Sequence, residues 1–527
     1  MHALLSAGLL AGALGWTACG SGPDLSAAEP VGRPPRLDPD YTALVIPPNI
    51  APLSFRILEE AERAIVRISP AAGAAVELSC PDGVCRPDPD DWRDLLDRSR
   101  GQALRYEVYA TAAGGAWRRF EPFANTVAAE PIDPYIAFRQ LAPNSQFTAI
   151  KGIFQRHLET YEREPIITLR GGTFECVNCH TFHQNNPDRF LFHVRRKHSG
   201  TVLVMDGQIR KVNTRHDPMF RPLAFASWHP DGRHVAATLN MYVGNSPSTV
   251  DGYHFQAFEK RGDLAVYDAV ENTMSSTRAV FGDEYIETHP YCSPDGRFIY
   301  YVRGRDRPLI SHRDLYDLEF DLMRIPYDVD GDVWGEPETV VAYSELGLSC
   351  AFPCPSPEGR YMLHILSDHG TYPVYQKSSD VYILDLESRE FHKPAGVNSE
   401  FAESYPRWSS NGRWFSFVSS RRDGRSALPY FAYFDSSGRA HKAFVLPQRD
   451  PGHYDTFTDT YNVLELIRSR VDVDAFELAR AMQQPAVDAT FPAPPPVDAH
   501  TGATRQWLEE TLPASPRTTP DSSSVAR

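Results

Sequence analysis

One short stretch of the chain carries residue types that bind metals and cofactors. It reads Cys176-Val-Asn-Cys179-His180, two thiols two residues apart followed directly by an imidazole. This spacing suits covalent haem attachment, because the two thiols can reach the two vinyl groups of one porphyrin while the histidine ligates the iron. The sequence therefore predicts haem c at residues 176–180, with His180 as the proximal ligand.

The second axial ligand has several candidates. His193 is the preferred candidate. It lies on the strand expected to follow the motif, near the end of that strand that is closest to the haem, and on the same face as Arg195. Arg195 could bind a haem propionate through two parallel hydrogen bonds. An empty sixth position would instead permit peroxide chemistry. The other possible ligands are His183, His198, Met219 and His289.

The same cysteines also fit a different metal. His193 and His198 follow them at the ligand spacing of a Cys-Cys-His-His zinc finger. A finger places its two histidines one turn apart on a helix, whereas Pro187 and the aromatic and β-branched run Phe190–Val194 indicate a turn and then a strand. We therefore favour haem over zinc, and a pair of structural cysteines is the third possibility.

The N-terminus has the features of an export signal. Residues 3–16 form an apolar run of signal-peptide length, too short for a comfortable membrane span. The following Thr17-Ala-Cys19-Gly20 resembles a bacterial lipobox, so residues 1–19 predict export with a lipid on Cys19, and an ordinary cleaved signal or an uncleaved anchor are the alternatives. We expect the protein in the periplasm or at the outer membrane, with a flexible tether over residues 20–40.

Charge and cysteine content limit the classes of partner. The net charge is −15 and no long basic block offsets it, which argues against binding to nucleic acid or to an anionic membrane surface. We therefore expect a redox partner or another envelope protein. The eight cysteines are too few for a disulfide scaffold of this length, although Cys80/Cys85 and Cys350/Cys354 are close enough for small-loop disulfides.

Residues 41–130 predict a small domain of their own. They contain short pieces such as Leu104–Tyr109, in which apolar and polar residues alternate, separated by connections rich in Pro and Asp. This alternation is typical of half-buried strands. The segment therefore predicts a β-rich, sandwich-like domain, and no motif within it indicates catalysis.

Four copies of one turn recur farther along the chain. Each copy is a short run of polar residues or proline that ends in Gly-Arg. A segment in which apolar and polar residues alternate, as in a strand, follows each copy. The polar residues start a tight turn, and glycine takes the positive φ that the turn needs. Repeats roughly 60 residues apart predict sheets that pack on one another as propeller blades. The four glycines are Gly232, Gly296, Gly359 and Gly412.

We therefore predict an all-β fold, in which a propeller of about six blades spans residues 131–450 behind the sandwich-like domain. The cysteine motif fits the same template, with a turn at residues 186–189, a second strand at Phe190–Val194 and a third at Thr201–Met205. In a propeller the first strand of each blade lines the central axis. The haem is therefore expected at one mouth of the channel, opposite the glycine turns.

The repeated turns resemble those of the TolB-like family of β-propellers, over about residues 130–465. A TolB-like propeller with one Cys-x-x-Cys-His near its start is similar to a group of exported bacterial proteins. The resemblance implies a single-haem c-type cytochrome and brings no catalytic residues with it.

The C-terminal part predicts two further segments. Residues 451–482 read as an extension packed on the propeller, with a short helical pair at 461–467 and 473–482. Residues 483–527 are rich in Pro, Thr, Ser and Ala and predict a disordered tail.

Three functions remain as hypotheses. The first is single-electron transfer by a non-enzymatic propeller cytochrome. The second is a TolB-like interaction scaffold whose Cys/His cluster holds structural zinc or a disulfide. The third is a haem peroxidase with an open sixth position.

Overall fold

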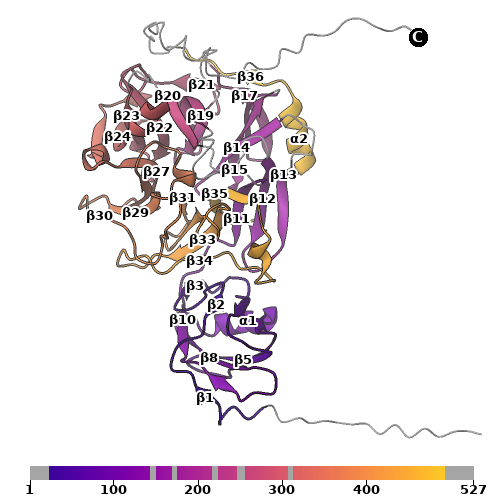
Figure 1. The fold of residues 1–527 in the computed structure, drawn as a ribbon. Coiled ribbons are helices and arrows are strands. Elements are labelled where there is room, and N and C mark those ends of the chain that lie inside the picture. The colour runs from indigo at the N-terminus through magenta and orange to yellow at the C-terminus, as the bar shows by residue number, and fades with distance from the viewer. Residues whose placement is uncertain are drawn as a thin grey trace, which may run out of the picture.

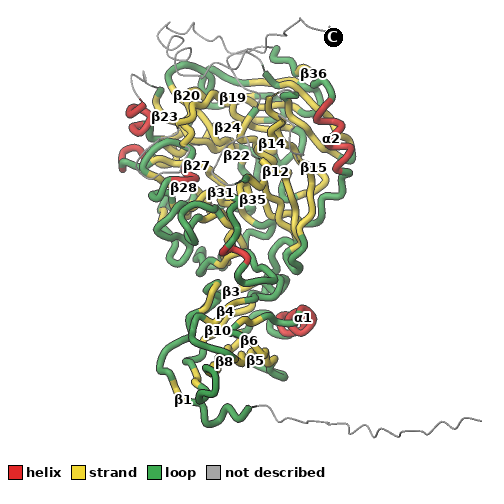
Figure 2. Tube along the Cα trace, turned by 45° about the vertical axis from the view of Figure 1, so that its right-hand side comes forward, coloured by secondary structure: helices red, strands yellow, loops and turns green. Residues whose placement is uncertain are grey.

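The structure is a computed structural model of the whole chain, in which most of the regular elements are strands (Figures 1 and 2). It forms a small N-terminal β domain followed by a six-bladed β-propeller. The residues that it describes are 23–142, 150–168, 175–196, 198–215, 223–245, 256–306 and 312–492. The predicted export signal and Cys19, Met219, and residues 493–527 of the predicted tail lie outside them.

The N-terminal domain has two sheets and one helix, α1 (Pro89–Asp97). The larger sheet contains β1 (Glu29–Pro30), β3 (Val45–Ile46), β5 (Arg63–Ser69), β6 (Val76–Pro81), β8 (Ala103–Thr111), β9 (Arg118–Arg119) and β10 (Phe123–Val127). The smaller sheet contains β2 (Leu37–Asp38), β4 (Phe55–Ile57) and β7 (Val84–Cys85). The prediction of a tether over residues 20–40 is wrong for its second half, because β1 and β2 pair with β9 and β4.

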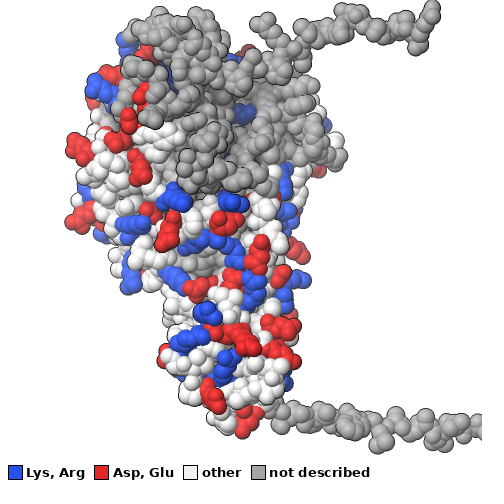
Figure 3. Space-filling view, in the orientation of Figure 1, with Lys and Arg blue, Asp and Glu red and all other residues white. Residues whose placement is uncertain are grey.

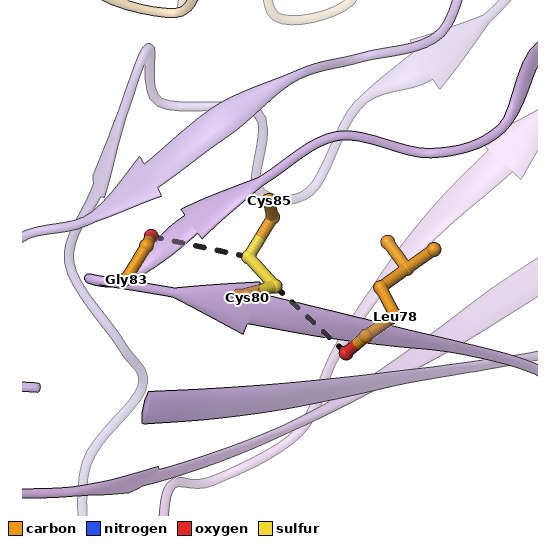
Figure 4. The surroundings of a disulfide bond; sticks show 4 residues. All are labelled: Leu78, Cys80, Gly83 and Cys85. Carbon is orange, nitrogen blue, oxygen red and sulfur yellow. Dashed lines mark hydrogen bonds between the residues drawn. A yellow bond between two sulfur atoms is a disulfide. The ribbon is translucent and has the colours of Figure 1, made fainter. Parts of the chain in front are cut away.

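One of the two expected disulfides forms. Cys80 and Cys85 are bonded and join β6 to β7, with the sulfurs 3.8 and 4.0 Å from the carbonyl oxygens of Leu78 and Gly83 (Figure 4). Cys350 and Cys354 are both free and buried. A bulge lies between them, and their side chains pack in different hydrophobic clusters on the two sides of the strand, so they cannot meet.

The propeller has six sheets, each with its innermost strand on the central channel. Numbered from the sheet that joins both ends of the propeller, the strands of blades one to three are β35 (Thr460–Ile467), β11 (Tyr135–Leu141), β12 (Ile150–His157) and β13 (Arg163–Thr168); β14 (Glu175–His183), β15 (Asn186–Arg196), β16 (Gly200–Met205), β17 (Gln208–Asn213) and β36 (Val487–Asp488); and β18 (Ala224–Trp228), β19 (His234–Asn245), β20 (Gln256–Asp268) and β21 (Thr273–Ser275).

The other three blades continue the ring in chain order. Their strands are β22 (Tyr285–Cys292), β23 (Phe298–Arg305), β24 (Phe320–Asp328), β25 (Val333–Trp334) and β26 (Glu338–Val341); β27 (Ser349–Pro355), β28 (Tyr361–Ser367), β29 (Asp380–Asp385) and β30 (Phe391–His392); and β31 (Glu403–Trp408), β32 (Trp414–Ser419), β33 (Leu428–Tyr433) and β34 (Phe444–Val445). The predicted count of six is confirmed.

The glycine turns are confirmed as well. Gly232, Gly296, Gly359 and Gly412 have φ between 65° and 79°, the left-handed region that glycine enters without a steric penalty. In the second blade the turn lies two residues earlier than predicted. Gln184 and Asn185, both with positive φ, connect β14 directly to β15.

The two ends of the propeller segment close the ring. Strand β35 pairs with β11, so a strand from the end of this segment becomes the innermost strand of the first blade. The prediction of a helix at residues 461–467 is therefore wrong. Every residue of β35 is buried, so its sequence lacks the alternation that marks a half-exposed strand. The propeller extends beyond the predicted end at residue 450.

The segment after β35 also differs in part from its prediction. Helix α2 (Ala475–Gln483) forms where a helix was expected and covers β13 and β17 (Figure 1). The beginning of the predicted disordered tail is ordered, because β36 pairs in parallel with β17 and Thr490 bridges to Thr273 in the third blade. These residues tie the second and third blades together from outside.

The N-terminal domain packs beside the sixth blade, near β33 and β34 (Figure 1). Arg56 contacts Asp455 at 2.6 Å, and Arg422 contacts Asp38 at 2.9 Å, so each domain supplies one arginine and one aspartate. Among the described residues visible in Figure 3, acidic and basic side chains are intermixed without a large patch of one sign.

Candidate functional site

The innermost strands bend at equivalent places. Each inner strand has a bulge at which its pairing with the next strand is interrupted. The first residue of each bulge is not glycine, yet its φ lies between 46° and 52°. Such a residue costs about 1–2 kcal/mol, so its recurrence in all six blades indicates that ring closure imposes it. We call these six residues the bulge ring; they are Cys179, Phe225, His289, Phe352, Tyr405 and Val463.

The position after the bulge ring separates the second blade from the others. Five strands carry an apolar residue there, and only β14 carries a titratable side chain, His180. Because alanine, proline and leucine serve the other blades, the propeller fold does not require an imidazole here. The five counterparts of His180 are Ala226, Pro290, Pro353, Pro406 and Leu464.

His180 is buried, with 2% of its surface exposed. Neither ring nitrogen has a hydrogen-bond partner among the described residues. Burial lowers the pKa of His180 to about 3, and the nearby charges of Arg139 and Arg407 lower it further in the same direction. The imidazole is therefore neutral near pH 7, the form that ligates metals.

Cys179 lies beside His180 at the same small cavity in the channel. Its thiol is free and partly exposed. The backbone of Cys176 pairs with that of Arg195, three residues before the bulge, and the position of its side chain is outside the described part of the structure. Cys179 and His180 are thus the two motif side chains that the structure brings together.

The donor set fits covalent haem, but the cavity that the described residues line is too small to enclose one. The cavity at Cys179 and His180 has a volume of about 40 Å³, whereas ligand pockets usually measure about 300–1,000 Å³. Aromatic residues of the bulge ring fill the channel, with Phe225 and Phe352 each about 4.2 Å from the ring of His289. A porphyrin bound to these cysteines would therefore extend outside this cavity.

His193 and Arg195 share a face of β15, as predicted, but neither lines this cavity. His193 is fully buried, its Nδ1 is 2.9 Å from Thr201 Oγ1, and its Nε2 has no partner among the described residues. Burial holds its pKa well below the ordinary value, and Arg195 acts in the same direction. Arg195 donates to the carbonyl oxygen of Leu223 at 3.0 Å. Their haem-binding roles stay predictions.

His289 is the alternative ligand that the structure places in the cavity with His180. Its Nδ1 accepts a hydrogen bond from the Phe352 amide at 3.2 Å, so the neutral ring carries its proton on Nε2. Nε2 would have to lose this proton to bind iron. His183 lies toward the glycine turns, with Nε2 3.1 Å from the Pro230 carbonyl, and His198 follows β15.

Three charged residues near His180 were missed by the sequence prediction. Arg139 of β11 is buried, and its Nε and Nη1 have no partner among the described residues. Arg407 of β31 and Glu465 of β35 occupy equivalent positions two residues after the bulge ring. Burial raises the pKa of Glu465 to about 7, against the effect of Arg407. Nothing in the sequence marks the bulge, so nothing places these residues around it.

The described residues contain no group of three or more His, Cys, Asp or Glu side chains that could hold a metal ion. Since the side chain of Cys176 is not among them, the zinc hypothesis remains untested. In the same part of the chain, no helix has the length and apolar character needed to cross a membrane.

No protein-family model and no curated protein matches the chain. A structure described as a TolB from Agrobacterium tumefaciens is 13% identical over 64% of this chain and 99% of its own, with a TM-score of 0.36. A puromycin-hydrolysing peptidase from Mycobacterium tuberculosis is 11% identical over 59% and 54%, with a TM-score of 0.35. Hydrazine synthase from Kuenenia stuttgartiensis is 13% identical over 50% and 64%, with a TM-score of 0.28. At these scores the propeller fold rests on the strand order alone.

Proposed function

We propose that this protein is an exported c-type cytochrome, in which Cys176 and Cys179 hold one haem covalently and His180 is its axial ligand. The supporting observation is the chemical state of His180. It is a neutral imidazole without a hydrogen-bond partner among the described residues, at a ring position where five other blades carry apolar residues. Single-electron exchange with another envelope protein is the proposed activity.

The haem supplies the one-electron redox chemistry when it is bound. The chain supplies a neutral nitrogen ligand and the positive charges of Arg139 and Arg407, both of which lower the pKa of His180. Buried positive charge favours the reduced state of a nearby centre. The propeller fixes these groups on paired strands of the first, second and sixth blades, so little rearrangement is expected when an electron arrives.

Haem attachment can be tested directly. Protein from a bacterial host with haem-attachment machinery should gain the mass of one haem and give a pyridine haemochrome spectrum. Cys176→Ala with Cys179→Ala should abolish both signals. Cys292→Ala is the control, because Cys292 is another free cysteine on an inner strand, β22, and lies outside the motif. The proposal would be refuted if the wild-type protein from this host carried no covalently attached haem.

A second candidate is a propeller scaffold that binds another protein. The filled channel favours it, because the space at His180 measures about 40 Å³. On this hypothesis the cysteines bind zinc or form a disulfide. Stoichiometric zinc by elemental analysis, or loss of two hydrogens by intact mass, would identify this state in protein that lacks haem.

A further inference from the structure

We propose that the mouth of the channel on the side of the glycine turns binds a small organic anion, through a carboxylate or phosphate group. A pocket of about 310 Å³ lies there, within the usual size range for small-molecule sites. It is separate from the cavity at Cys179, and Tyr291 and Arg407 line both spaces. This site does not depend on haem attachment.

Two tryptophans form an apolar wall of the pocket. The indole N–H of Trp228 donates to the carbonyl oxygen of Thr181 at 3.2 Å, and that of Trp408 donates to Cys354 at 2.9 Å. Both polar edges are thus used by the neighbouring inner strand. The aromatic surfaces and the turn residues Pro230 and Pro294 remain to contact the carbon skeleton of a ligand.

Arg407 gives the floor of the pocket a positive charge. Its guanidinium donates to the Pro406 carbonyl at 3.1 Å and lies 5.7 Å from the centre of the Tyr291 ring. In the described part of the chain it has no carboxylate within ion-pair distance. Glu465 also lines the pocket, and burial raises its pKa to about 7, so it is only partly charged at neutral pH.

Arg468 is a second arginine in the lining of the pocket. It is exposed, its backbone amide donates to the Asn185 carbonyl at 2.9 Å, and its side chain has no ion pair to any described residue. Arginine binds carboxylate and phosphate through parallel hydrogen bonds. Two arginines beside an aromatic wall therefore select a small anion with an apolar part.

Isothermal titration of the full-length protein tests this site with three probes: succinate, its neutral analogue succinamide, and inorganic phosphate. We expect one molecule of succinate or phosphate to bind per chain and succinamide not to bind. Arg407→Met should weaken binding about tenfold or more, since a hydrogen bond between charged groups contributes about 1.5–3 kcal/mol. Arg468→Met should weaken it severalfold.

Arg389→Met is the control variant. Arg389 also donates to one backbone carbonyl, that of Val340 at 3.0 Å, but it lies outside the pocket on the outer part of the fifth blade. Its loss should leave binding unchanged. If Arg407→Met fails to fold, titration of Arg468→Met tests the proposal, because Arg468 is exposed. Binding of succinamide as tightly as succinate, equal anion binding by wild type and Arg468→Met, or no anion binding by the wild type would overturn the proposal.

Discussion

Strands β14 and β35 lie next to each other in the ring and have the same bulge, but they carry different chemistry at the following residue. In β35 this residue is Leu464, which is fully buried in the hydrophobic core. In β14 it is His180, which is equally enclosed yet has two ring nitrogens without partners among the described residues. An unsatisfied buried polar group costs about 1–3 kcal/mol. The two strands therefore have the same backbone geometry, but only the second blade has a destabilising side chain at this position.

The largest effect on stability is expected at Leu464, the apolar residue that is equivalent to His180. Leu464→Ala should lower the free energy of unfolding by about 2–5 kcal/mol, because it leaves a cavity in a packed core. Urea denaturation measures this loss. His180→Ala, at the equivalent position, should cost much less, since it also removes two unsatisfied nitrogens. Equal losses for the two variants would contradict the comparison.

Replacing His180 with leucine, the residue at the equivalent position of β35, should stabilise the protein rather than destabilise it. In haem-free protein, His180→Leu should raise the free energy of unfolding by about 1–3 kcal/mol, because it replaces unpartnered polar atoms with apolar ones. The same urea experiment applies.

His364→Leu is the control for this substitution. His364 is also buried, but its Nε2 is 2.8 Å from the hydroxyl of Tyr343, which would lose its partner. This variant should therefore be less stable than the wild type. If His180→Leu is destabilised to the same extent, His180 is a structural histidine.

The smallest effect is expected at buried acids that do have partners. Burial raises the pKa of Asp263 to about 7 and that of Glu287 to about 8, although Arg261 and Arg303 are close. The folded state thus holds protons that the unfolded chain releases near pH 4. This contribution to stability is complete below about pH 4 and is lost as the pH rises through about 7–8.

Asp263→Asn should remove part of this pH dependence. Thermal unfolding from about pH 5 to pH 9 should show a smaller fall in Tm for the variant than for the wild type, with the difference growing toward high pH. Asp385→Asn is the control, because Asp385 is paired with Arg360 near the surface and its pKa is lowered instead. An unchanged slope in Asp263→Asn would show that Asp263 is not protonated in the folded state.

The sequence predicted the blades because their turns have local causes. The positive φ of Gly232 or Gly296 follows from the turn itself, so the residue type reveals it. The bulge ring has no such signal, since residues as different as Cys179, Phe225 and Val463 adopt the same backbone. Only closure of the ring makes these positions equivalent.

Other features depend on contacts between distant segments. Strand β35 is buried on both faces by the blades around it, which removed the alternation that identifies a strand. Strand β36 has two residues and exists only because β17 offers a free edge. The cysteine motif could be recognised from its spacing, whereas Arg139 and Arg407 meet His180 only after three blades have been assembled.

The pairing of β35 with β11 also sets an order of events. The ring stays open during synthesis until the last inner strand has been made, long after the cysteine motif has emerged. Because the gap lies directly beside the second blade, β14 keeps one unprotected side throughout this period. On the proposed function, an enzyme that attaches haem to these thiols would have access to them until β35 closes the ring.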